Sequence, residues 1–401
     1  MSTLSKFPWR WARPNANVGN KLKKRAGRGK KAVREKSVTI EEVARRSGVS
    51  PKTVSRVVNR ESVVRQETRE KVSRAIKELG YRPHPGARIM RGRRSGIIGM
   101  ITSAISETGQ PASETGLSSI HIVRGVQEVC RAKGFTLMIA DSRGKPGEIE
   151  QLTEIFNNHR VEGVIYAADH HKMVEFEIPS GTRAVLANCF GSPDIAAVVP
   201  DDAIGQKLAA NHLFECGHRR IGMVALNPEV LAAHLRRKGL REACELAGVP
   251  QNVAHYRTGI DPNRLRGKFC ALEEAIRSLL SSPERPTAIM FGNDLLALRA
   301  WPALASAGIC IPRDLSVIGF DNDERICDAL IPRLTTVALP YFEIGCRAAK
   351  MLFQMIERGA IVCKIEKVPC YLVRRESTGS PSSGDDDTRS QGKKFRNHYA
   401  C

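Results

Sequence analysis

Short apolar runs alternate with longer helical stretches from residue 96 onward, and this alternation constrains the fold more than any other feature. Strands that alternate with helices form parallel sheets covered by helices. The runs fall into two sets, which predicts an α/β body of two doubly wound parallel-sheet lobes. The first set is IIGMI (97–101), FTLMIAD (135–141), GVIYAA (163–168) and AVLAN (184–188), and the second is RIGMVAL (220–226), HYRTGI (255–260), AIMFGND (288–294) and LSVIGFDND (315–323).

The positive charge of the chain is concentrated near its N-terminus. The formal net charge is +21, of which residues 1–36 contribute +11 and residues 37–95 contribute +9. The body from residue 96 is almost neutral, so the basic quarter predicts a head that binds a polyanion such as a nucleic acid. Residues 1–36 have no apolar pattern and are interpreted as a disordered basic extension. The alternative to a role in binding a polyanion is a basic tail that is only solvated.

Residues 37–82 combine this charge with the pattern of three short helices. Thr39 and Ser50 are suited to helix N-caps, and Gly48 is suited to ending the first helix. The apolar residues of the three helices fall on faces that can share one core. The second helix, PKTVSRVV, therefore presents its lysine and arginine outward, where they can reach phosphates and base edges in a major groove. A plain three-helix bundle with solvated charges is the alternative.

The stretches VTIEEVARRSGVSPKTVSRVVN and ETREKVSRAIKELGYRP resemble the DNA-binding head of the LacI/GalR family of bacterial transcription regulators. The resemblance continues through motifs such as HLFECGHRRIGMVA and VRRESTG, over residues 37–377. It implies an all-α helix-turn-helix head and an effector-binding and dimerisation body (96–377) like that of periplasmic binding proteins. It also implies a homodimer that binds a pseudo-palindromic operator in double-stranded DNA.

The resemblance assigns the DNA contacts of the head to its second helix. Pro51, Lys52 and Arg56 match positions that contact bases, and proline offers only apolar contact, so Lys52 and Arg56 are expected to carry most of the direct readout. Asn59 lies on the same outward face and is counted with them. The neighbouring hydroxyl side chains match contacts to the DNA backbone: Ser50, Thr53 and Ser55.

Residues 83–95 match the family's hinge, a segment that becomes a short helix on the operator. Met90 takes the position of a leucine that wedges into the minor groove, and methionine is a competent apolar wedge. Arg88 is expected to face a phosphate. A Pro-Gly pair at the start of the segment disfavours helix, so the hinge helix is expected to begin late. An ordinary solvated linker is the alternative.

Polar residues at the carboxyl ends of the predicted strands are candidates for effector binding, because ligands of doubly wound sheets lie there. Asn188, Asn293 and Asp321 end strands, although a local cap or turn is the alternative for each. Arg236 begins an R-x-x-G motif in which the family's arginine binds ligand hydroxyls or a carboxylate. Ser118 lies in GLSS, where the family usually has aromatic residues, and adds a hydroxyl candidate.

A repressor that responds to a sugar or a related metabolite is therefore the main hypothesis. A solute-binding protein for uptake would fit the body, but the basic head and the lack of an apolar signal peptide oppose it. The motifs G-x-S-x-G, GxxxxGK[ST], G-x-G-x-x-G and HExxH are absent from the sequence. We therefore expect no catalytic residues, no enzyme activity and no cofactor.

Several further features agree with a cytoplasmic protein that does not enter membranes. No apolar run is long enough to span a bilayer. The eleven cysteines form no CxxC pair, which predicts reduced thiols rather than a zinc site or disulfides. His170 and His171 follow a strand with no third ligand at metal spacing, so we interpret them as surface histidines and expect no metal. The polar stretch 378–401 is predicted to be a disordered tail.

Overall fold

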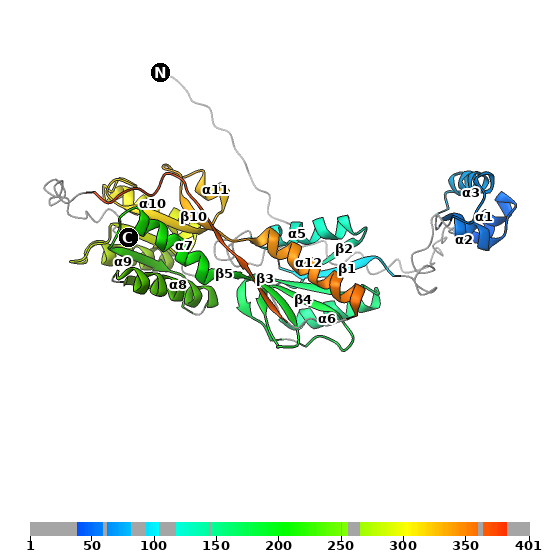
Figure 1. The fold of residues 1–401 in the computed structure, drawn as a ribbon, viewed down its shortest axis with the longest axis horizontal. Helices are drawn as coiled ribbons and strands as arrows, with labels where there is room; N and C mark the ends of the chain where they lie inside the picture. The colour runs from blue at the N-terminus through cyan, green and yellow to red at the C-terminus, as the bar shows by residue number, and fades with distance from the viewer. Residues whose placement is uncertain are drawn as a thin grey trace, which may run out of the picture. The chain divides into compact units, whose positions relative to one another are not determined.

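The computed structural model describes residues 38–58, 62–81, 94–103, 118–143, 146–175, 177–228, 230–249, 251–255, 265–359 and 364–382. The described residues belong to two compact units, which we call the head (38–81) and the body (94–382) (Figure 1).

The head consists of the three helices that the sequence predicts. They are α1 (Ile40–Ser47), α2 (Pro51–Val58) and α3 (Gln66–Leu79). Thr39 and Glu42 form a capping box at the start of α1, in which the Thr39 N–H donates to Glu42 Oε2 over 2.8 Å. Gly48 ends α1 with a φ of 70°, a left-handed conformation that glycine adopts without strain. Small apolar side chains make up the core of the head: Val43, Ala44, Val54, Val57, Val72 and Ala75.

The body contains two six-stranded sheets, which we call lobe 1 and lobe 2. The strand order is β11-β5-β4-β3-β1-β2 in lobe 1 and β12-β10-β9-β8-β6-β7 in lobe 2. Neighbouring strands are parallel, except that β12 runs antiparallel to β10. The predicted pair of doubly wound lobes is therefore confirmed.

The strands of lobe 1 are β1 (Ile97–Thr102), β2 (Thr136–Asp141), β3 (Val164–Met173), β4 (Ala184–Phe190), β5 (Ala196–Asp201) and β11 (Ile365–Pro369). The strands of lobe 2 are β6 (Ile221–Ala225), β7 (Gln251–His255), β8 (Ala288–Phe291), β9 (Ser316–Asp321), β10 (Thr335–Ala338) and β12 (Tyr371–Val373). The apolar runs did not predict β5, β10, β11 or β12. The predicted strand HYRTGI is displaced, because β7 ends at His255 and residues 256–260 lie outside the described residues.

Helices cover both faces of each sheet (Figure 1). In lobe 1, α5 (Ser118–Ala132) and α12 (Tyr341–Arg358) share a core on one face, and α6 (Pro146–Asn158) packs on the other. In lobe 2, α7 (Asp202–Glu215) and α8 (Leu231–Ala247) cover one face. The opposite face is covered by α9 (Leu265–Leu280), α10 (Asp294–Ser306) and the short α11 (Glu324–Cys327).

The chain passes from one lobe to the other after β5, after β10 and after β11. The first passage places Asp202 at the start of α7, directly beyond the carboxyl end of a lobe 1 strand. The second places Tyr341 at the start of α12, where its side chain packs against the cores of both lobes. Residues at these passages therefore contact both lobes.

The end of the described body is bonded into lobe 2. Thr378 and Gly379, which the sequence places in the predicted tail, each meet a histidine of this lobe. His212 Nε2 lies 2.9 Å from Thr378 Oγ1, and His218 Nε2 lies 2.8 Å from the Gly379 carbonyl oxygen. Burial lowers the pKa of both imidazoles, so both favour the neutral form.

The described part of the chain includes no helix that is both long enough and apolar enough to cross a membrane.

A glycine on each helix allows α5 and α12 to pack closely in lobe 1. A β-carbon on Gly125 would overlap the Phe342 carbonyl oxygen, and one on Gly345 would overlap the Ile122 carbonyl oxygen. Both obstacles are backbone atoms, which cannot rotate away. The two helices can therefore approach to this distance only because neither glycine has a side chain.

We predict that Gly125→Ala lowers the free energy of unfolding by at least about 2 kcal/mol, because the added methyl group forces the two helices apart. Urea denaturation followed by circular dichroism measures this change. Gly147→Ala is the matched control, since a β-carbon there meets nothing within 4 Å. An unchanged midpoint for Gly125→Ala would contradict the close packing.

Candidate functional site

The α2 helix presents polar and charged side chains on the face opposite its buried valines. Ser50 caps the helix, with its Oγ 3.0 Å from Thr53 Oγ1 and accepting a hydrogen bond from the Thr53 N–H. Pro51 and Lys52 are exposed, whereas Ser55 and Arg56 are half-buried. The structure therefore brings these predicted DNA-contacting residues together on one short helix.

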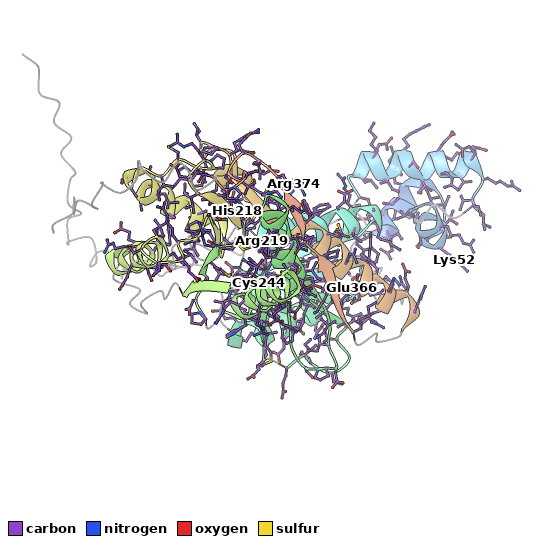
Figure 2. The ribbon with its side chains drawn as sticks, turned by 60° about the vertical axis from the view of Figure 1, so that its left-hand side comes forward. Lys52, His218, Arg219, Cys244, Glu366 and Arg374 are labelled. Carbon is purple, nitrogen blue, oxygen red and sulfur yellow. The ribbon has the colours of Figure 1, made fainter. Side chains whose placement is uncertain are left out.

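Lys52 is the most available cation of this face. Figure 2 shows its side chain extending from α2, and among the described residues it makes no hydrogen bond or ion pair. Other cations of the head are engaged, such as Arg46 with Glu78 at 2.6 Å and Lys71 with Glu67 at 2.8 Å. An exposed lysine without a partner can meet a phosphate or a base without losing an existing ion pair.

Four predicted site residues cannot be placed. Asn59, Arg88 and Met90 lie outside the described residues, and Ser118 begins α5 but its side chain is not among those described. Their roles remain predictions.

A buried group of charged side chains lies where the first passage enters lobe 2. Arg236 of α8 donates from Nε to Asp202 Oδ1 over 2.9 Å, and its Nη2 lies 3.6 Å from Asp321 Oδ1. A further hydrogen bond joins its Nη1 to the Gly292 carbonyl oxygen. The guanidinium also stacks on the Phe320 ring, 3.6 Å from its centroid. The sequence predicted Arg236 and Asp321 as site residues, and they lie together.

His171 of lobe 1 joins the same group from the other side. Its Nδ1 lies 2.8 Å from Asp202 Oδ2, and its side chain is 6% exposed. The interpretation of His171 as a surface histidine is therefore wrong. The cause is the length of β3, which continues through residue 173 and carries the ring toward lobe 2, whereas the apolar run stops at Ala168. His170 remains partly exposed, beside Asp169.

Asp202 connects the two lobes and was not recognised as a candidate in the sequence. Burial acts to raise the pKa of its carboxyl, but the charge of Arg236 and the hydrogen bond from His171 hold the pKa below its usual value. An ionised carboxylate only accepts hydrogen bonds, so His171 donates its Nδ1–H. We call the linked groups His171, Asp202, Arg236 and Asp321 the charge chain.

Asp321 ends β9 with a φ of 115°, a conformation that non-glycine residues rarely adopt. Strain of this kind persists at positions where a particular side-chain direction is required. Burial together with the neighbouring carboxylates raises the pKa of Asp321 to about 8, even though Arg236 opposes the shift. Its side chain is 24% exposed, so this carboxyl can still reach a ligand.

The two predicted asparagines have local roles in the structure. Asn188 is buried, has a φ of 59° and donates from Nδ2 to the Ala168 carbonyl oxygen over 3.2 Å. Asn293 accepts the Leu296 N–H at the start of α10, as an N-cap does. Neither bond excludes a second role, and their contact with an effector remains a prediction.

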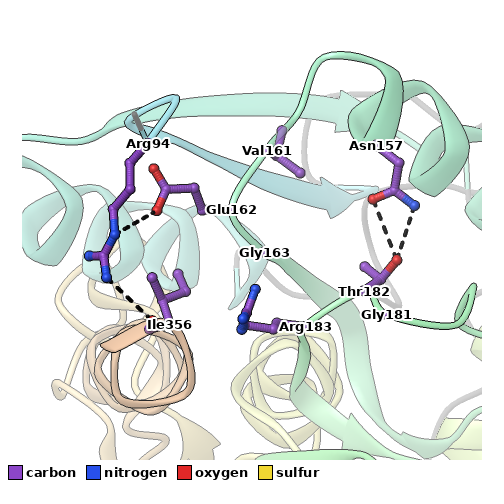
Figure 3. A pocket seen from close by; sticks show the side chains of 9 residues that line it. All are labelled: Arg94, Asn157, Val161, Glu162, Gly163, Gly181, Thr182, Arg183 and Ile356. Carbon is purple, nitrogen blue, oxygen red and sulfur yellow. Dashed lines mark hydrogen bonds and ion pairs between the residues drawn. The ribbon is translucent and has the colours of Figure 1, made fainter. Parts of the chain in front are cut away.

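A pocket of about 460 Å³ lies at the opposite edge of lobe 1, at the amino ends of β1, β3 and β4 (Figure 3). Arg94 crosses its rim, with Nη2 donating to the Ile356 carbonyl oxygen over 3.4 Å and Nε lying 3.7 Å from Glu162 Oε2. Ligands of doubly wound sheets bind at the carboxyl ends of strands, so this pocket is not the expected effector site. Within the described ranges, no group of three or more His, Cys, Asp or Glu is arranged to hold a metal ion.

Comparisons with known proteins find matches for both the head and the body. A family model described as "Bacterial regulatory proteins, lacI family" matches residues 39–84, and a periplasmic binding protein-like domain matches residues 210–378. The ribose operon repressor of Escherichia coli (strain K12) is 31% identical over 343 residues, covering 84% of this chain and 99% of the repressor.

Two solved structures extend the comparison. A transcriptional regulator CelR–cellobiose complex is 27% identical with a TM-score of 0.55, covering 85% of this chain and 99% of CelR. The second structure is the lac repressor dimer bound to operator and the anti-inducer ONPF, with a TM-score of 0.67 and 24% identity. The match covers 86% of this chain and all of the lac repressor chain, and at this identity it supports the fold alone.

We predict that Asp202→Asn lowers the free energy of unfolding of the body by about 3 kcal/mol, because it leaves the buried Arg236 without its nearest counter-charge. Chemical denaturation measures the loss. Asp314→Asn is the control, since Asp314 pairs at the surface with an Arg313 that is 74% exposed, and we expect a change below about 1 kcal/mol. Equal effects would show that the burial of the Asp202 pair has no energetic consequence.

Proposed function

We propose that this chain, which belongs to the lacI family of bacterial regulatory proteins, is a repressor that binds operator DNA and releases it when a small metabolite binds between its lobes. The observation that carries the proposal is the three-helix head, whose α2 presents Lys52 and its capping hydroxyls on an exposed face. Such a helix fits a major groove, where lysine and arginine read guanine edges.

Within this function, we assign base contacts to Pro51, Lys52 and Arg56 and backbone contacts to the hydroxyls of Ser50, Thr53 and Ser55. Residues 37–82 would form the DNA-binding domain and 83–95 the hinge, in which Met90 enters the minor groove and Arg88 meets a phosphate. Asn59 would add a polar contact at the end of α2. Residues 1–36 would form an N-terminal extension, and the proposed C-terminal tail (378–401) would begin later than its sequence boundary, because Thr378 and Gly379 are bonded into lobe 2.

A homodimer fits both the relatives and the geometry of operator binding. Two heads read two half-sites of a pseudo-palindrome when the protein itself has twofold symmetry. The lac repressor was solved as a dimer on its operator. In lobe 2, Ile331 is 88% exposed on a loop anchored by a hydrogen bond from Trp301 Nε1 to the Ile331 carbonyl oxygen. A second copy would bury this side chain.

The effector is proposed to be sugar-like. One relative is named for the ribose operon, and another was solved with cellobiose. Arg236 and Asp321, with Ser118, Asn188 and Asn293, are the proposed contacts. Effector binding changes operator affinity if the two ligands favour different arrangements of the lobes.

The alternative classes have less support. The relatives with matching heads are transcriptional regulators, which argues against both a solute-binding protein and an enzyme. We propose that the chain catalyses no reaction, needs no cofactor and works in the cytoplasm, where its operator is.

The test is selection of an operator from the genome of the source organism. The purified chain is mixed with sheared genomic DNA at physiological salt, and the retained fragments are sequenced. The proposal predicts enrichment of a few fragments that share one pseudo-palindrome. Retention of DNA without any shared sequence, across repeated selections, would contradict it.

We predict that Lys52→Ala relaxes the preference for one base pair in each half-site, costing about 1–3 kcal/mol of discrimination. Binding to the selected operator and to its single-base variants measures this directly. Lys71→Ala is the control, because Lys71 lies on α3 and pairs with Glu67. A uniform loss of affinity over all variants would instead assign Lys52 to a phosphate.

A further inference from the structure

The amino-end edge of the lobe 1 sheet is the part of the body that the proposed hinge joins. Strands β1, β2, β3 and β4 run parallel, so the segments that precede them meet at one edge, and the last turn of α12 is bonded to this edge through Arg94. The described body begins at Arg94, so the chain from the proposed hinge enters here. We call this surface the hinge edge, and it consists of residues 94–96, 131–135, 157–163, 180–183 and 356–359.

The hinge edge is basic, although the body as a whole is almost neutral. It holds six Lys or Arg residues and two Glu residues, a surplus of four positive charges. Both glutamates face cations of the same edge, since Glu357 Oε1 lies 2.8 Å from Lys133 Nζ and Glu162 Oε2 lies 3.7 Å from Arg94 Nε. The surplus therefore remains after the internal pairs are formed.

Three cations of the hinge edge are available to an external anion. Arg160, Arg183 and Arg358 are exposed, and among the residues that the structure describes none of their side chains makes a hydrogen bond or ion pair. Cations that follow a helix also complement the helix dipole, which is a sufficient local role for Arg160 and Arg358. Arg183 belongs to no helix and precedes β4, so its unpaired charge has no such role.

Arg183 and Arg94 line the same open pocket of about 460 Å³ (Figure 3). Arg94 is 57% exposed, and its interactions are long, at 3.4 Å to the Ile356 carbonyl oxygen and 3.7 Å to Glu162. Glu162 is only 11% exposed and also accepts the Gly96 N–H over 2.8 Å. The guanidinium groups are therefore presented to solvent more than the carboxylate is, and guanidinium is the group best suited to phosphate oxygens.

The length of the chain brings DNA close to this edge. Met90, which we propose to enter the minor groove, precedes Arg94 by four residues. Four residues of fully extended chain span at most about 14 Å. The minor groove is about 6 Å wide and has phosphates on both sides. The hinge edge therefore lies near the DNA backbone at any angle between head and body.

We propose that the hinge edge binds backbone phosphates of the operator through Arg183 together with Arg94, so that the body itself contacts DNA. This inference rests on the proposed function and adds a third contact surface to the head and the hinge. Phosphate contacts position a protein on the duplex and carry no sequence information. The surface therefore strengthens binding to any duplex and makes that binding more sensitive to salt.

The experiment measures operator binding of the full-length chain by fluorescence anisotropy over a series of salt concentrations. Arg183→Gln removes the charge and keeps a polar side chain. Each phosphate contact contributes about 0.9 to the slope of log K against log[salt], so the slope should become shallower by about 0.9, or by about 1.8 when both copies in a homodimer make the contact. The loss of affinity should be the same for every single-base variant of the operator.

Arg285→Gln is the matched control. Arg285 is exposed, precedes β8 and makes no side-chain bond within the described ranges, but it lies at the amino end of the lobe 2 sheet. That end faces away from the hinge edge, because the chain passes between the lobes at the carboxyl ends of β5 and β10. We expect the parent slope for Arg285→Gln and for Arg183→Lys, which keeps the charge. Equal melting temperatures establish that the variants are folded.

The outcomes separate this inference from the repressor function. Operator binding with the same slope in the parent chain and Arg183→Gln overturns the inference and leaves the repressor function standing. An Arg183→Gln affinity that falls by one factor at every salt concentration also overturns it, because the arginine then acts through the protein structure. An equally shallow slope for Arg285→Gln would show that loss of any positive charge suffices, which contradicts a contact at the hinge edge. A parent chain that selects no operator contradicts both proposals.

Discussion

The buried ion pair between Asp202 and Arg236 is the interaction on which the centre of the body depends. Arginine cannot lose its proton inside a protein, so a side chain that is only 4% exposed needs a counter-charge beside it. Asp202 provides that charge from the first passage between lobes and also accepts the His171 N–H from lobe 1. One carboxylate therefore links the two lobes and orients the arginine proposed to meet the effector.

The remaining architecture holds these groups in place. The parallel sheets bring the carboxyl ends of β9 and β5 to the passage, which places Asp321 and Asp202 on either side of Arg236. On lobe 1, α5 and α12 are fixed against each other by Gly125 and Gly345. Near the C-terminal end of α12, the Ile356 carbonyl oxygen accepts a hydrogen bond from Arg94, which lies three residues before the start of β1.

Much of this could be predicted from the sequence because the signals are local. Caps at Thr39 and Ser50 and the spacing of valines defined the head, and apolar runs defined the buried strands. The misses have non-local causes. Strands β11 and β12 are half-exposed edge strands whose pattern depends on their partners. His171 was taken for a surface residue because nothing nearby in sequence shows that β3 continues to Met173. Asp202 resembled an ordinary first-turn residue, and only the fold reveals that Arg236 and His171 meet it.

The central claim is that one chain couples a site between the lobes to the head that binds DNA. The most direct test measures operator affinity by fluorescence anisotropy at increasing concentrations of a neutral sugar that binds the chain. The account predicts that saturating sugar weakens operator binding at least tenfold, and that operator DNA weakens sugar binding by the same factor, as linkage requires. Operator affinity that stays constant while the sugar saturates its site would contradict the account.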